Sequence, residues 1–463
     1  MIFNSYVFCI IFLPSFLFLF FLTNKFNQNY RIILFVTFSF IFYGYFNPPL
    51  IILLLVSICT NYLFSTIIFK NNKIIYLYII IFLNLILLFY FKYSLFFIED
   101  LLNLNVKYDL FWKYALPIGI SFFTFQQISY QVDLFKKETE TKGFLKYLFY
   151  VSFFPQLVAG PIVRHNYFFK QITNKEFLKV NTENFKIGIS IFSIGIIKKV
   201  FFADIISNYV DQTYSTCLEI KCSQSDYIIS TYLYSFQIYF DFSAYSDMAL
   251  GLAKIFGIKL PYNFNSPYKS NSIIHFWRKW HITLSSFLKT YLYIPLGGSK
   301  TSIIKKNTNL IITMLLGGLW HGAGLNFILW GLIHGIGLTI NHYNKHIFQI
   351  KVNKFISIFL TFTFVSIAWI FFRSENINQG LNIFTQLFII NDFNPKIYRV
   401  DNIGRWLTLF ILSLIVVFFC PNSNRFYEKY IKKYKIIKYI LIFLLIFSIF
   451  GLDKSNEFIY YEF

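Results

Sequence analysis

The sequence predicts an all-helical, polytopic integral membrane protein with about ten to twelve helices of membrane-spanning length. Three observations predict this class. Hydrophobic residues make up 56% of the 463-residue chain, charged residues only 14%, and the mean hydropathy is +0.56. A soluble globular domain carries about 25% charged residues, so this chain does not belong to that class. Aromatic residues reach 22%, which excludes intrinsic disorder, because disordered chains are poor in aromatic side chains.

The formal net charge is +21. In a soluble protein this excess would indicate a nucleic-acid partner. In a membrane protein, basic residues gather in cytoplasmic loops and attract anionic lipid, so we expect membrane lipid and no nucleic acid as the partner. Paired lysines mark candidate cytoplasmic loops at residues 136–137, 198–199, 305–306 and 432–433.

Apolar segments follow one another along the whole chain. The first, residues 2–23, has neither a charged leader nor a small-residue cleavage site, so it is predicted to be a retained membrane span and not a signal peptide. The remaining segments cover residues 31–46, 50–69, 74–98, 116–129, 147–163, 185–197, 228–256, 310–340, 355–372, 406–420 and 440–450.

Two regions do not fit a simple membrane span. Residues 147–163 contain Pro155, Gly160 and Pro161, so this segment is predicted to be re-entrant or broken. Membranes tolerate such a backbone only where protein or water covers the freed polar groups. Residues 261–306 are amphipathic and basic and contain three prolines. We expect them to lie along the cytoplasmic surface or to dip into the protein.

The cysteines and histidines give no sign of a metal site. The five cysteines lack metal-binding spacing and the histidines do not form an HExxH pattern, so no metal is expected. Cys217 and Cys222 flank a polar loop, and they would form a disulfide if this loop lies outside the cytoplasm. GxSxG, Rossmann and phosphate-loop motifs are also absent from the sequence.

His321 lies among glycines at residues 317–324, in an otherwise apolar run. Glycines permit a backbone or a ligand to approach closely. A neutral imidazole there can accept a proton from a hydroxyl group, because its ordinary pKa lies near working pH. The alternative is a core histidine with glycines that serve packing alone. His334 would lie about 220° around a continuous helix from His321, so we expect it to be structural or supporting.

Residues 275–285 form the second candidate. If this segment is one helix, Trp277, His281 and Ser285 share a face at four-residue spacing, with Arg278 and Lys279 beside it. The functional interpretation is an acyl-donor site, in which the cations hold phosphates and the aromatic rings form an apolar wall. The alternative is an interfacial helix with an aromatic belt and lipid-binding cations.

The third candidate is the polar cluster at residues 237–248, inside an apolar segment. Asp241 and Tyr245 lie one helical turn apart and share a face, whereas Asp247 points elsewhere. A proton relay and a buried ion pair with Arg278 are both compatible with this pattern.

Six blocks of sequence, taken together, resemble the membrane-bound O-acyltransferase superfamily. The match is nearest to its bacterial branch that O-acetylates polysaccharides, the alginate and peptidoglycan acetyltransferases. The resemblance treats residues 1–463 as a single membrane domain with a matching core at about residues 115–340. The blocks are LPIGISF (116–122), FPQLVAGPI (154–162), YFDFSAYSD (239–247), FWRKWHITLS (276–285), YLYIPLGG (291–298) and LWHG (319–322).

The resemblance implies helices and re-entrant segments around a central funnel, with His321 and His281 as the catalytic residues. His321 would act as the general base on an acceptor hydroxyl. His281 would hydrogen-bond the thioester carbonyl and stabilise the oxyanion. Asp241, Tyr245 and Ser285 would support this site. The donor would be cytoplasmic acetyl-CoA, with no bound cofactor.

The same resemblance implies a multi-pass protein of the bacterial inner membrane. Its acetyl group would pass to a separate periplasmic, esterase-like (SGNH-type) acetyltransferase partner that modifies the polysaccharide, either alginate-like or peptidoglycan. Three alternatives remain open. They are a D-alanine exporter for teichoic acid, a lipid acyltransferase, and a channel or polysaccharide flippase without acyl-transfer chemistry.

Overall fold

All regular elements in the described part of the chain are helical, which confirms the all-helical part of the predicted class. The computed structural model describes residues 1–102, 104, 116–172, 177–178, 181–219, 222–389, 395, 403–452 and 458–459. The chain forms two compact units. The first comprises Met1–Ile196, Tyr245–Pro261 and Tyr434–Glu462, and the second comprises Ile197–Ala244 and Tyr262–Lys433.

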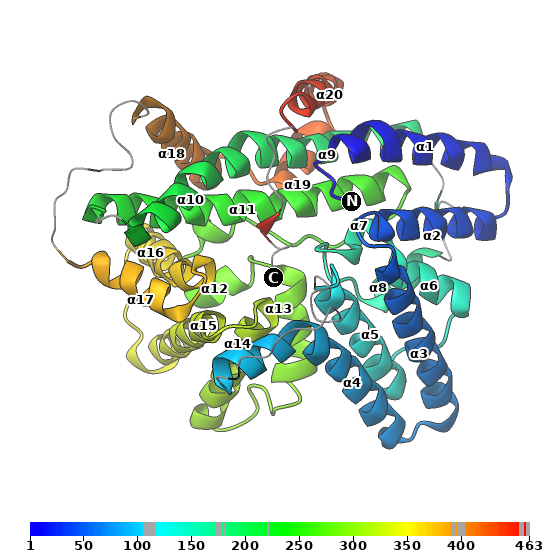
Figure 1. The fold of residues 1–463 in the computed structure, drawn as a ribbon, viewed down its shortest axis with the longest axis horizontal. Helices are drawn as coiled ribbons and strands as arrows, with labels where there is room; N and C mark the ends of the chain where they lie inside the picture. The colour runs from blue at the N-terminus through cyan, green and yellow to red at the C-terminus, as the bar shows by residue number, and fades with distance from the viewer. Residues whose placement is uncertain are drawn as a thin grey trace. The chain divides into compact units, whose positions relative to one another are not determined.

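The first unit contains the N-terminal helices, of which α3, α4 and α5 pack against one another (Figure 1). Pro49 begins α3, where its missing N–H costs no helical hydrogen bond, and Asn72 ends it in a left-handed conformation. The helices are α1 (Leu13–Leu22), α2 (Gln28–Gly44), α3 (Pro49–Asn71), α4 (Ile74–Leu88), α5 (Ile120–Phe135), α6 (Phe144–Ser152), α7 (Phe154–Leu157), α8 (His165–Ile172), most of α9 (Thr182–Lys198) and α20 (Lys435–Ile449).

Buried amides join α3, α4 and α5. The Nδ2 atom of Asn61 donates to Oδ1 of Asn84 at 3.1 Å, and Asn84 returns the bond at 2.9 Å. Gln131 Nε2 donates to the Asn61 carbonyl oxygen at 2.6 Å. Apolar helices gain no specificity from hydrophobic contact in lipid, so paired amides of this kind fix how such helices meet.

The segment at residues 147–163 is broken, as predicted. Helix α6 ends at Ser152, and the short helix α7 begins at Phe154 with Pro155 in its first turn. The Phe154 ring packs edge-to-face against Phe12 and Phe16 of the same unit. The break therefore lies inside an aromatic core.

The second unit contains the candidate site. Helices α14 and α15 pack closely. A Cβ atom on Gly318 would collide with the Phe327 carbonyl oxygen, and a Cβ atom on Gly331 would collide with the Met314 carbonyl oxygen, so this close contact requires glycine at both positions. The helices are α10 (Asp204–Glu219), the first part of α11 (Gln224–Ile255), α12 (Ile273–Trp277), α13 (Ile282–Leu288), α14 (Ile303–His321), α15 (Leu325–Tyr343), α16 (Lys354–Arg373), α17 (Ile377–Gln386), α18 (Ile403–Phe418) and α19 (Ser423–Phe426).

The structure of the described residues contradicts two expectations from the sequence. The apolar run at residues 310–340 is not one helix, because α14 ends at His321 and α15 begins at Leu325. A Cβ atom on Gly322, between the two helices, would collide with the Phe327 ring, so this close turn requires glycine there. Lys199 does not lie in a cytoplasmic loop, because it begins a π-helical turn (Lys199–Ala203) that joins α9 to α10.

Three helices in the described part are long and apolar enough to cross a membrane: Pro49–Asn71, Ile74–Tyr93 and Lys354–Arg373. A fourth span is obtained if Gly404–Phe418 and Ser423–Ile431, which are bent by 66° at their junction, count as one. The protein is thus a membrane protein by composition and helix length. Its predicted count of ten to twelve helices of spanning length remains a prediction.

Candidate functional site

His281 lies between two short helices and not on a helix face. Helix α12 ends at Trp277, α13 begins at Ile282, and His281 has a left-handed backbone with φ of 41°. The predicted common face of Trp277, His281 and Ser285 is therefore wrong. A residue in the left-handed region cannot continue an α-helix, so the four-residue spacing loses its meaning here.

The side chain of Asn263 stabilises this turn through hydrogen bonds. Its Oδ1 atom accepts hydrogen bonds from the Thr283 backbone N–H at 3.2 Å and from the Thr283 hydroxyl at 2.7 Å. The same oxygen lies 3.3 Å from Nδ1 of His281. No local sequence signal identifies Asn263, because nothing distinguishes one asparagine of this polar loop as a partner of a histidine.

His321 meets His281 in the second unit. His321 is the last residue of α14, and the centres of the two imidazole rings are 6.4 Å apart. Both side chains are buried, with 3% and 0% of their surface exposed. Trp330 and Phe372 pack edge-to-face on the His321 ring at 5.1 and 5.2 Å. The structure thus brings together the two residues that the sequence analysis had singled out.

Burial sets the charge of His281. It lowers the pKa of the imidazole from its ordinary value of 6.5 to about 3, because the charged form loses its hydration. His281 is therefore neutral at working pH. A neutral imidazole has one nitrogen that donates and one that accepts, which suits it to proton-transfer chemistry.

The three residues expected to bind the donor differ in their exposure to solvent. Trp277 is buried, and its Nε1–H donates to Nδ1 of His334 at 3.2 Å. His334 is fully buried and accepts this hydrogen bond, so it helps to orient the Trp277 indole. Arg278 is exposed, and Lys279 is half-buried. Of the supporting residues, Ser285 donates its backbone N–H to the His281 carbonyl oxygen at 2.9 Å.

Asp241 forms a buried ion pair, but its partner is Lys199 and not Arg278. The Lys199 ammonium lies 2.6 Å from Asp241 Oδ1 and 2.9 Å from Asp204 Oδ1. All three residues are at least 95% buried. Lys199 and Asp204 are not expected in this ion pair from the sequence, because a lysine pair beside an apolar segment is typical of a membrane-flanking loop.

Tyr245 belongs to the first unit. Its ring stacks on Phe3 with centroids 4.9 Å apart, and the Ala159 backbone N–H donates to its hydroxyl oxygen at 3.4 Å. These contacts give Tyr245 a packing role within that unit.

Comparison with known proteins identifies one family and several relatives of this chain. The model of the membrane-bound O-acyltransferase family, MBOAT, matches residues 52–373. The peptidoglycan O-acetyltransferase of Helicobacter pylori is 35% identical over 92% of this chain and 91% of its own length. The "Probable alginate O-acetylase AlgI" of Pseudomonas aeruginosa is 34% identical over 93% and 83% of the two chains. The teichoic acid D-alanyltransferase of Bacillus subtilis is 27% identical over 56% of this chain.

The match therefore covers most of the chain and includes both histidines of the buried pair. This chain belongs to the membrane-bound O-acyltransferase family and is an O-acyltransferase.

Proposed function

We propose that this protein moves an acetyl group from cytoplasmic acetyl-CoA across a bacterial inner membrane for O-acetylation of a cell-envelope polysaccharide. The observation that carries the proposal is the buried pair of His281 and His321, with ring centres 6.4 Å apart. The names of two relatives, a peptidoglycan O-acetyltransferase and an alginate O-acetylase, support this class of acceptor.

In the proposed reaction, His321 is the general base. It takes the proton of an acceptor hydroxyl while the hydroxyl oxygen attacks the thioester carbonyl carbon. The carbon–sulfur bond then breaks, and the leaving thiolate takes the proton from His321. Acetyl ester and coenzyme A thiol are the products, so protons and electrons balance.

The contact with Asn263 supports a role for His281 that differs from the expected oxyanion donor. Asn263 Oδ1 accepts from Thr283, so it is an oxygen, and it favours the tautomer with the His281 proton on Nδ1. The Nε2 atom of a neutral His281 then carries a lone pair. We assign His281 to positioning, in which it accepts a hydrogen bond from an O–H or N–H group of a substrate.

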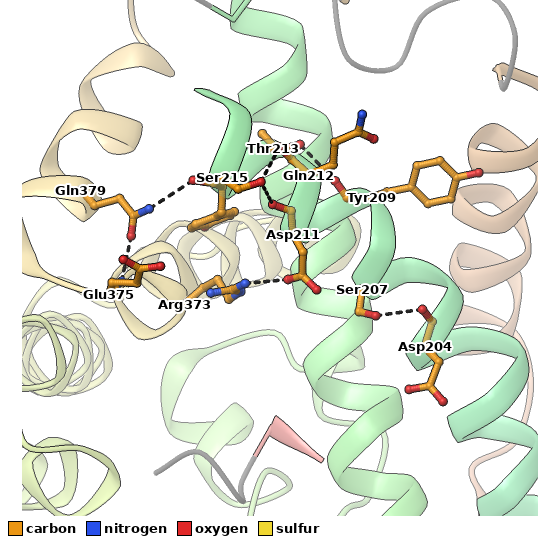
Figure 2. A network of polar contacts seen from close by, with 11 residues as sticks. Asp204, Ser207, Tyr209, Asp211, Gln212, Thr213, Ser215, Arg373, Glu375 and Gln379 are labelled. Carbon is orange, nitrogen blue, oxygen red and sulfur yellow. Dashed lines mark hydrogen bonds and ion pairs between the residues drawn. The ribbon is translucent and has the colours of Figure 1, made fainter. Parts of the chain in front are cut away.

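The disulfide supports an orientation for the second unit. Cys217 and Cys222 join the end of α10 to the start of α11, and disulfides persist in oxidising compartments. Figure 2 shows the polar network at this end, where Asp211 pairs with Arg373 at 2.6 Å. We therefore place this network, and with it the C-terminal end of α16, on the extracytoplasmic side.

A further part of the proposal is a periplasmic, esterase-like partner that receives the acetyl group. In this proposal the partner carries out the final transfer to the polymer outside the membrane.

The test is the base-labile acetate of purified peptidoglycan and exopolysaccharide from cells with the intact chain, without it, or with His321→Ala. His342→Ala is the matched control, because it removes a histidine outside the pair. Acetate on one polymer that is lost in the null and His321→Ala strains but kept in the control supports the proposal. Unchanged acetate on every polymer refutes it and makes D-alanine esters of teichoic acid the next product to assay.

A further inference from the structure

A pocket of about 320 Å³ opens beside the candidate site in the second unit. Its lining includes Ile282, which follows His281 directly, together with Asn265, Asn422, Arg425 and Glu428. Its volume is at the lower end of the range for small-molecule sites, about 300–1,000 Å³. It is large enough for the charged end of a ligand whose remainder lies outside it.

The loop that supports His281 also builds this pocket. Asn263 contacts His281, and two residues further on Asn265 lines the pocket. The Asn265 backbone N–H donates to the Lys279 carbonyl oxygen at 3.0 Å, and Asn422 Nδ2 donates to Asn265 Oδ1 at 2.9 Å. A ligand in the pocket would therefore lie against the segment that holds the buried histidine.

Arg425 on the pocket wall interacts electrostatically with two lysines near it, Lys269 and Lys279. Arg425 is exposed and forms no ion pair with a carboxylate among the described residues. Burial, and then the charges of Arg425 and Lys269, lower the pKa of the Lys279 ammonium. Glu428 on the pocket wall lies 3.2 Å from the Lys432 ammonium, which offsets its charge. Like charges held together repel, and an anion in the pocket would relieve that repulsion.

Lysines accompany the pocket in the sequence. Arg425 and Glu428 of the pocket wall lie in the segment Ser423–Ile431, and lysines stand at residues 429, 432, 433 and 435. Lysine-rich segments are typical of the cytoplasmic side of a membrane protein, so we assign the pocket to that side as part of the inference.

We propose that this pocket binds the phosphate groups of an organic phosphate ligand, with the Arg425 guanidinium as the principal contact and Lys269 and Lys279 beside it. A guanidinium binds phosphate oxygens in pairs, which makes arginine the stronger recognition group. The assignment of the ligand as the nucleotide end of the acetyl donor rests on the proposed function. The same phosphate chemistry occurs in a lipid headgroup.

The test measures binding of adenosine bisphosphate, the anionic end of coenzyme A without its thioester, to the full chain in uncharged detergent by calorimetry. Arg425→Gln should weaken binding by about 10- to 100-fold. Arg405→Gln on α18 is the matched control, because it removes an exposed arginine away from the pocket, and it should leave binding unchanged. Arg425→Glu, which reverses the charge, should weaken binding further.

The outcomes separate the pocket from the proposed reaction. His321→Ala should stop acetyl transfer and keep adenosine bisphosphate binding, whereas Arg425→Gln should raise KM for acetyl-CoA and keep kcat. If acetyl transfer is absent in the intact chain but binding depends on Arg425, the proposed phosphate site is supported and the proposed reaction is refuted. Equal binding by the intact chain and Arg425→Gln overturns the proposal. Short-chain phosphatidylglycerol that binds through Arg425, where adenosine bisphosphate does not, overturns the nucleotide assignment.

Discussion

Replacing Lys199 by methionine should destabilise the protein severely, because it removes an ammonium group that pairs with two buried carboxylates. The ammonium lies 2.6 Å from Asp241 and 2.9 Å from Asp204, and one positive charge already serves two negative ones. Methionine keeps the length of the side chain and removes the charge, so the change tests electrostatics and not volume.

The magnitude follows from these distances. With an effective dielectric constant of about 20, Coulomb's law gives about 6 kcal/mol of attraction for each contact. Desolvation of the three groups offsets much of this attraction, and loss of one partner from a buried pair typically costs about 3–5 kcal/mol. Asp204→Asn should cost only about 1 kcal/mol, because it leaves the neutral pair of Lys199 and Asp241 intact.

The assay is thermal unfolding of the purified protein in detergent, followed by the loss of monodisperse material on size-exclusion chromatography. The intact chain and Asp204→Asn should unfold at similar temperatures, and Lys199→Met should unfold well below both. A Lys199→Met variant as stable as the intact chain would refute the view that the ammonium compensates two buried charges.

Three further predictions concern the turn, the helix hairpin and the disulfide. Asn263→Asp puts a carboxylate beside Nδ1 of His281 and raises the low pKa of that imidazole, so transferase activity near pH 6 should fall relative to pH 8; an unchanged pH profile would contradict the contact. Gly318→Ala forces a methyl group against the Phe327 carbonyl and should lower the free energy of unfolding by about 1–3 kcal/mol, measured by denaturant titration; equal stability would mean that α14 and α15 do not meet as described. With Cys9, Cys59 and Cys420 replaced by serine, Cys222→Ser frees the thiol of Cys217, which a membrane-impermeant maleimide should label in intact cells; labelling only after lysis would reverse the orientation.

Composition was enough to predict the class of fold, and local sequence was enough to predict several of its breaks. In lipid, the backbone N–H and C=O groups of an apolar segment must be hydrogen-bonded within the protein, and a helix achieves this within a single segment. Pro155 and the neighbouring glycine–proline pair marked a broken segment, and the structure ends α6 at Ser152. Such signals are local, because proline removes a backbone N–H wherever it stands.

The prediction based on four-residue spacing was wrong where the backbone is not helical. The common face of Trp277, His281 and Ser285 assumed a continuous helix, and the left-handed residue His281 interrupts it. That conformation is stabilised by Asn263, which lies 18 residues before His281, so the four-residue helical spacing does not include it.

Composition and local pattern were enough to predict an all-helical membrane protein and to select His281 and His321 as candidates. The distance of 6.4 Å between these two rings, the pairing of Asp241 with Lys199 and the place of Arg425 in a pocket beside His281 became visible in the folded structure. The difference arises because hydropathy and backbone restrictions act on each segment separately. The pairing of buried charges and imidazoles depends on which segments pack together, and that is set by contacts between residues far apart in the chain.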